Sequence, residues 1–86
     1  GNMAKALIDG DINKVIEIRD SKLSGLEGDE YKQKLGSLKS TLTSKVKPVY
    51  VDYYLNGEYD SMDELKVLLM DYFGYEEKTI DKWLEG

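Results

Sequence analysis

The stretch Ser61–Gly86, SMDELKVLLMDYFGYEEKTIDKWLEG, predicts two short helices joined by a tight turn at Gly74. Apolar side chains recur in it at three- and four-residue spacing, which is the pattern of a half-buried helix. They are Leu65, Leu68, Leu69, Tyr72 and Phe73 before the turn, and Ile80, Trp83 and Leu84 after it. Two helices this short cannot bury both stripes against each other alone. The upstream chain therefore has to supply the rest of the core.

The start of this stretch carries a capping-box pattern, Ser61-Met-Asp-Glu64. In such a box the hydroxyl accepts a hydrogen bond from the third helical N–H, and the glutamate reaches back to the N–H of the cap residue. We therefore predict a helix that begins after Ser61 and ends near Phe73.

The segment Val49–Leu55 is consistent with either helix or strand. Its β-branched and aromatic residues, followed by Asn56-Gly57, are typical of a β-hairpin, but only Glu58–Asp60 would remain for the return strand. A helix would place Pro48 in its first turn, where proline is tolerated. We favour the helix and keep as the alternative an α+β fold with a short hairpin at 49–60.

Two further helices are predicted upstream. Asp11 is expected to cap a helix that runs to about Leu23. Asp29 is expected to cap a longer helix that ends at Lys47-Pro48, because proline disfavours helical geometry at the residue before it. The expected buried stripe of this longer helix is Tyr31, Leu35, Leu38, Leu42 and Val46.

The chain has 86 residues, 41% of them apolar, which suffices for one domain with a modest core. We predict an all-α fold, a compact bundle of four to six short helices in a single domain, 1–86. Residues 1–2 precede Met3 and are interpreted as a cloning remnant. Residues 3–47 would form a helical hairpin and a basic-faced helix, and residues 48–86 a C-terminal part.

The sequence contains neither cysteine nor histidine. Their absence excludes disulfides, thiolate and imidazole metal ligands, and Cys–His or Ser–His catalysis. No apolar run approaches the roughly 18–20 residues of a membrane span, and no signal peptide is visible. We expect a cytoplasmic protein that is not an enzyme, holds no cofactor or metal, and has no membrane partner.

Charge is divided unevenly along the chain, whose net charge is −5. Residues 1–51 carry nine basic and seven acidic side chains, whereas residues 52–86 carry three and ten. The segment Tyr31–Val51 holds five lysines and no acid. Such an asymmetry concerns partners rather than fold. It would also allow self-association, with the basic half of one copy against the acidic half of another.

Five groups of residues in 48–86 match a known pattern of apolar spacing and turn glycine. They are Tyr53–Gly57, Ser61–Leu65, Phe73–Tyr75, Thr79-Ile80, and Trp83-Leu84 with Gly86. The pattern resembles helix-turn-helix modules of the three-helix kind, as in transcriptional regulators and phage terminase small subunits. The resemblance implies a DNA-binding regulatory protein. In it, the groove would be approached by Lys78, Thr79 and Lys82, and phosphates would be held by Lys32, Lys39 and Lys45.

The helix that would read DNA carries more acids than bases: Glu76, Glu77, Asp81 and Glu85 stand against Lys78 and Lys82. A duplex presents a negative charge about every 1.7 Å and would repel it. We therefore rank another function higher, that of a small acidic protein-interaction module, an accessory or inhibitor protein of a phage or mobile element. It would bind a basic surface on another protein.

The contact residues expected for this interaction module are aromatic anchors and acids. They are Tyr50, Tyr54, Tyr59, Glu76, Glu77, Asp81 and Trp83. This hypothesis requires the aromatic residues to be exposed, because a buried ring cannot anchor a partner.

Overall fold

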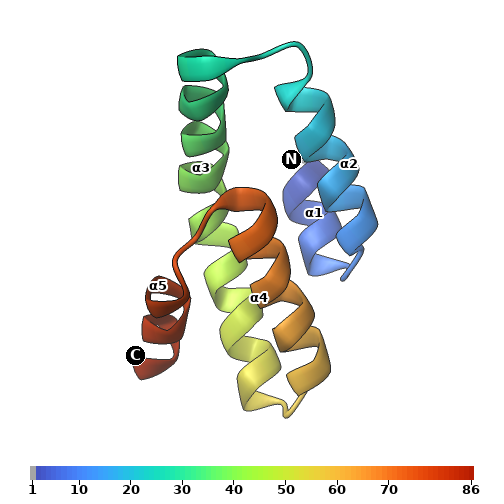
Figure 1. Cartoon of the computed structure of the whole chain (residues 1–86). Helices are drawn as coiled ribbons and strands as arrows, with labels where there is room; N and C mark the ends of the chain where they lie inside the picture. The colour runs from blue at the N-terminus through green and yellow to red at the C-terminus, as the bar shows by residue number, and fades with distance from the viewer. Residues whose placement is uncertain (1) are drawn as a thin grey trace. The chain divides into compact units, whose positions relative to one another are not determined.

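The computed structural model describes residues 2–86, and every regular element within them is a helix (Figure 1). The elements are α1 (Asn2–Ile8), α2 (Ile12–Leu23), α3 (Gly28–Leu55), α4 (Tyr59–Phe73), α5 (Glu77–Lys82) and the short 3-10 helix η1 (Trp83–Glu85). This confirms the all-α prediction and the helix at Val49–Leu55. The alternative hairpin at 49–60 is wrong. The chain divides into two compact units, the first ending at Val46 and the second running from Lys47 to Gly86.

The first unit contains α1, α2 and the part of α3 up to Val46. Asp11 begins α2 as predicted, because its carboxylate accepts a hydrogen bond from the Lys14 N–H at 3.1 Å. At the other end of α2, the Arg19 guanidinium donates to the Tyr31 hydroxyl on α3 at 2.9 Å. The buried side chains of this unit are Met3, Ala6, Leu7, Val15, Leu23, Leu42 and Val46.

The predicted apolar stripe of α3 is buried only in its later half. Leu42 and Val46 are in the core, whereas Tyr31, Leu35 and Leu38 are half-buried. Apolar side chains lose solvent contact only where a neighbouring element covers them. The early half of α3 therefore keeps part of its apolar face accessible in the first unit.

Pro48 lies inside α3 and does not end a helix. The predicted boundary at Lys47-Pro48 is therefore wrong. An interior proline removes one backbone hydrogen bond and costs about 3 kcal/mol. The cost is offset by packing, because Val46 is fully buried in the first unit and Tyr50 is 1% exposed in the second.

Two predicted helix starts are displaced. Helix α4 begins at Tyr59, so Ser61 lies within it and the predicted capping box does not form. The reason is the preceding turn: Gly57 adopts φ 72°, and the Glu58 N–H donates to the Tyr53 carbonyl at 2.8 Å. This turn reverses the chain at once, so α4 starts earlier. Asp29 likewise lies inside α3, which begins one residue before it.

Gly74 ends α4 as predicted. Its φ of 74° is the left-handed conformation that glycine adopts without steric cost. The next amide, that of Tyr75, donates to the Leu69 carbonyl at 3.0 Å, and α5 follows after two residues. The core of the second unit comprises Tyr50, Leu65, Leu68, Leu69, Phe73, Tyr75, Ile80 and Trp83. Tyr72, predicted in the buried stripe, is instead 36% exposed.

Candidate functional site

Two of the predicted aromatic anchors belong to the core of the second unit. Tyr50 is 1% exposed and Trp83 is 8% exposed. Their rings meet edge to face with centroids 6.0 Å apart, and Tyr75 meets Trp83 in the same way at 5.7 Å. Edge-to-face pairs of this kind are favourable beyond the area they bury. The interpretation of Tyr50 and Trp83 as partner contacts is therefore corrected, since both rings are used within the fold.

The other two predicted anchors are exposed at the turn between α3 and α4. Tyr54 is 44% exposed and Tyr59 is 55% exposed, and their ring centroids lie 6.4 Å apart. Leu55, which lies between them in sequence, is 72% exposed. We call Tyr54, Leu55 and Tyr59 the tyrosine tip. Sequence reasoning missed Leu55, although its place directly before the Asn56-Gly57 turn is a usable signal for exposure.

The surroundings of the tyrosine tip are acidic. The segment from Pro48 to Leu65 contains no lysine or arginine and five exposed acids: Asp52, Glu58, Asp60, Asp63 and Glu64. Within the described residues, none of these five carboxylates makes an ion pair. Asp63 follows Tyr59 by one helical turn and so shares its face of α4. The tip thus joins exposed aromatic rings to charge that nothing in the described chain neutralises.

The predicted acids of α5 are engaged within the second unit. Glu77 and Asp81 both contact the Lys66 ammonium of α4, at 3.4 Å and 3.0 Å. Glu76 contacts Lys78 at 3.5 Å. Glu77 and Asp81 are four residues apart and lie on one face of α5, which places both toward Lys66. Glu77 and Asp81 therefore help to hold α5 on α4, whereas the five acids around the tyrosine tip make no ion pair within the described residues.

Two pKa shifts accompany this packing. The hydrogen bond from Lys66 to Asp81, with that to Glu77, raises the pKa of the Lys66 ammonium above its ordinary 10.5. Burial raises the pKa of the Tyr50 phenol above its ordinary 10.0, because the ring environment disfavours the phenolate. In both cases the fold favours the protonated form.

The second unit is expected to lose stability as pH rises above 10.0, the ordinary pKa of tyrosine. A raised folded-state pKa contributes stability that is complete below the unfolded value and is lost as pH rises through the folded value. Urea unfolding at several pH values up to 11, followed by far-UV circular dichroism, measures this loss. Lys66→Met should lose less of its free energy of unfolding than wild type as pH rises. Tyr50→Phe should also lose less, and its difference from wild type should begin at a lower pH than that of Lys66→Met.

Lys82→Met is the matched control for Lys66→Met, because Lys82 is exposed on α5 and makes no ion pair within the described residues. Exposed ion pairs contribute up to about 1 kcal/mol, so the difference between the two variants should be of that size. Equal alkaline profiles for both lysine variants would contradict the role assigned to Lys66.

The residues expected to bind DNA fall into two sets, one in each unit. Lys78, Thr79 and Lys82 are exposed on α5, which has only six residues and is about 9 Å long. Lys32 and Lys45 are exposed on α3 in the first unit, and Lys39 is half-buried there. One of the three side chains on α5, Lys78, already faces an acid, Glu76.

The described residues hold no cluster of three or more side chains suited to a metal ion, and among them no helix is long and apolar enough to cross a membrane. Comparisons of the chain with models of known families, with characterised proteins and with solved structures gave no significant match.

Proposed function

We propose that this chain is a small acidic protein-interaction module that binds a basic, partly apolar surface of another protein through the tyrosine tip. The observation that carries the proposal is the exposed pair Tyr54 and Tyr59 with unpaired acids around it. Tyrosine combines a large apolar area with a polar end and is enriched in the centres of interfaces.

The tip is suited to a partner that presents lysine or arginine. A cation placed over a tyrosine ring gains about 0.5–2 kcal/mol, depending on how far it is desolvated. Nearby carboxylates add attraction at longer range and speed the encounter. The five acids around the tip supply that attraction, so a basic segment with an apolar residue for Leu55 fits this surface best.

The tip is also held rigidly by its own backbone. The amides of Asn56, Gly57 and Glu58 donate to carbonyls in the last turn of α3, at 2.9, 3.2 and 2.8 Å. A surface that is ordered before binding loses less conformational entropy when a partner docks. The turn therefore supports tighter binding than a flexible loop of the same composition would.

DNA binding by the helix-turn-helix resemblance is the second candidate. Its support is the turn at Gly74 between two helices and the three exposed residues of α5. Against it stands the local charge, since four acids lie around those residues and two of them, Glu77 and Asp81, pair with Lys66. The phage or mobile-element role and the cytoplasmic location stay predictions.

Selection of peptides from an unbiased display library on the immobilised full chain tests the proposal. Selected peptides are expected to be rich in lysine or arginine with at least one large apolar residue. Tyr54→Ala/Tyr59→Ala should weaken their binding about thirtyfold, which corresponds to roughly 2 kcal/mol for the pair of anchors. Calorimetry at low and high salt measures the affinities, and added salt should weaken binding by screening.

Val67→Ser is the matched control, because Val67 is 55% exposed on α4 and lies about 12 Å along the helix from Tyr59. It should leave peptide affinity unchanged. Peptides of neutral or acidic composition, or binding that survives the double tyrosine substitution, would contradict the proposal. Tighter binding of duplex DNA, lost in Lys78→Gln/Lys82→Gln, would favour the second candidate instead.

A further inference from the structure

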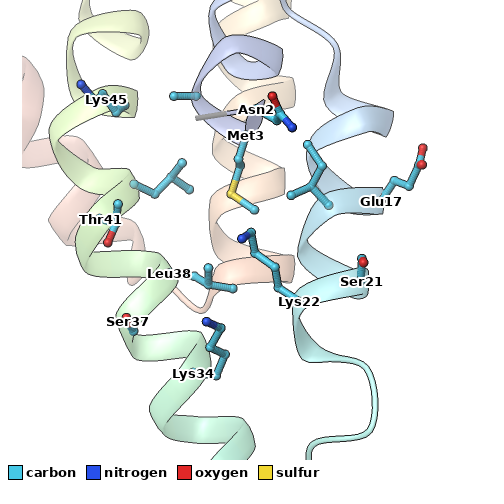
Figure 2. Close-up of a pocket in the computed structure, with 13 residues that line it drawn as sticks. Asn2, Met3, Glu17, Ser21, Lys22, Lys34, Ser37, Leu38, Thr41 and Lys45 are labelled. Atoms are coloured by element: carbon cyan, nitrogen blue, oxygen red, sulfur yellow. The ribbon is translucent and has the colours of Figure 1, made fainter.

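A groove opens in the first unit between α2 and the early half of α3, with α1 at one end. Its volume is about 630 Å³ (Figure 2). Apolar side chains from all three helices line it: Met3, Ile18, Leu38 and Leu42. Lys22 and Lys34 project into the opening from α2 and α3, beside Leu38. We call these six residues and the space between them the lysine groove.

The two ammonium groups of the lysine groove have no counter-charge within the fold. Neither Lys22 nor Lys34 makes an ion pair or hydrogen bond within the described residues. Glu17 is the one acid among the described residues that line the groove, and its carboxylate faces Lys14 at 3.5 Å. Like charges that share a site repel each other, and an anion placed between them removes that repulsion.

Charged, polar and apolar side chains alternate along the groove, since Ser37 and Thr41 line it beside Leu38, and Lys45 lines it one turn beyond Leu42. Lys22 and Lys34 lie near the connector between α2 and α3, whereas Met3 and Leu42 lie toward α1. From Lys34 to Leu42, α3 rises about 12 Å at 1.5 Å per residue. The groove thus has two lysines near the connector, with the half-buried Ile18 and Leu38 beside them and the buried Met3 and Leu42 beyond.

The volume of the groove limits the size of the anionic amphipathic ligands that it can hold. Small-molecule sites have volumes of about 300–1,000 Å³, and this groove lies within that range. A ligand with a single chain therefore fits the volume of this groove.

We infer that the lysine groove binds an anion with one alkyl chain, such as a long-chain carboxylate. The carboxylate lies between the ammonium groups of Lys22 and Lys34. The chain covers Ile18 and Leu38, whose partial exposure it removes, and lies against the buried Met3 and Leu42. This inference concerns the first unit and stands independently of the function proposed for the tyrosine tip.

Titration of the isotope-labelled full chain with sodium dodecanoate, kept below its micelle concentration, tests the inference by NMR. The methyl signals of Ile18, Leu38 and Leu42 are expected to shift, and the ring signals of Tyr54 and Tyr59 to stay in place. Two buried methylenes are worth about tenfold in affinity, so decanoate and octanoate should bind progressively more weakly. Dodecyltrimethylammonium, with the same chain and the opposite charge, should bind at least tenfold more weakly than dodecanoate.

Lys22→Gln/Lys34→Gln should weaken dodecanoate binding about tenfold. The matched control is Lys5→Gln/Lys32→Gln, which removes the same charge from exposed positions outside the groove and should change little. Circular dichroism checks that both variants keep their helix content. An equal loss of dodecanoate affinity in both double variants would show that only the overall charge matters, and would overturn the inference.

Three other results would also overturn it. One is an affinity that does not depend on the length of the alkyl chain, because acetate would then bind as tightly as dodecanoate. Another is a set of shifts centred outside the groove residues. The third is an acidic amphipathic peptide that shifts the same methyl signals and binds more tightly than dodecanoate, because the groove would then be a peptide site.

Discussion

Trp83→Ala is expected to destabilise the second unit by about 3–5 kcal/mol, the usual cost of removing a buried indole. Trp83 is 8% exposed, although it lies only three residues from Gly86. Its ring contacts Tyr50 of α3 and Tyr75 of the connector between α4 and α5, so truncation removes two edge-to-face contacts and leaves a cavity beside both rings. Because α5 and η1 are short, they depend on this ring for their packing.

Urea unfolding followed by far-UV circular dichroism measures the effect of Trp83→Ala without relying on tryptophan fluorescence. Trp83→Phe keeps an aromatic ring and should recover more than half of the loss. Leu84→Ala is the matched control, since Leu84 is the next residue and only half-buried. A loss below 1 kcal/mol for Trp83→Ala would contradict the buried position of the ring.

Pro48→Ala is expected to raise the free energy of unfolding by about 1–3 kcal/mol. Pro48 is exposed within the continuous helix α3, so its ring makes no core contact that alanine would lose. Alanine restores the backbone N–H that proline lacks, which allows the bond to the carbonyl of Ser44 one turn earlier. Alanine also has the highest helix propensity, about 3 kcal/mol above that of proline.

Pro48→Gly separates the two contributions to this gain. Glycine restores the same N–H but lowers helix propensity by about 1 kcal/mol relative to alanine, so its gain should be smaller by that amount. Both variants are measured by urea unfolding and by helix content. A lower stability for Pro48→Ala would contradict a helix that runs unbroken from Gly28 to Leu55.

The local features of this chain could be predicted from its sequence. Asp11 caps α2, and Gly74 reverses the chain after α4, because each acts through hydrogen bonds and dihedral angles within a few residues. The all-α class follows from apolar spacing over longer windows. Ser61 and Pro48 show where this reasoning fails. In each case a neighbouring turn or a buried side chain outweighed a local preference worth about 1–3 kcal/mol.

The candidate site was predicted only in part. Tyr54 and Tyr59 are at the surface as the interaction hypothesis requires, whereas Tyr50 and Trp83 are in the core. All four residues are aromatic, so residue type alone cannot separate them, although the apolar spacing had placed Trp83 in a buried stripe. The groove between α2 and α3 had no sequence signal, because its residues come from three helices and the two lysines near the connector from two of them.

Four properties of this protein follow from its sequence alone: the helical class, the turn at Gly74, the lack of histidine and cysteine chemistry, and the excess of acid from residue 52 onward. Which rings are buried and which carboxylates are neutralised depends on how the helices pack against one another. Lys66 meets Asp81 from fifteen residues away, and Trp83 meets Tyr50 from another helix. Exposure and pairing depend on such distant neighbours, whereas caps and turns depend on adjacent residues. At the turn between α3 and α4, this packing leaves Tyr54 and Tyr59 exposed and the acids beside them without an ion pair within the described residues.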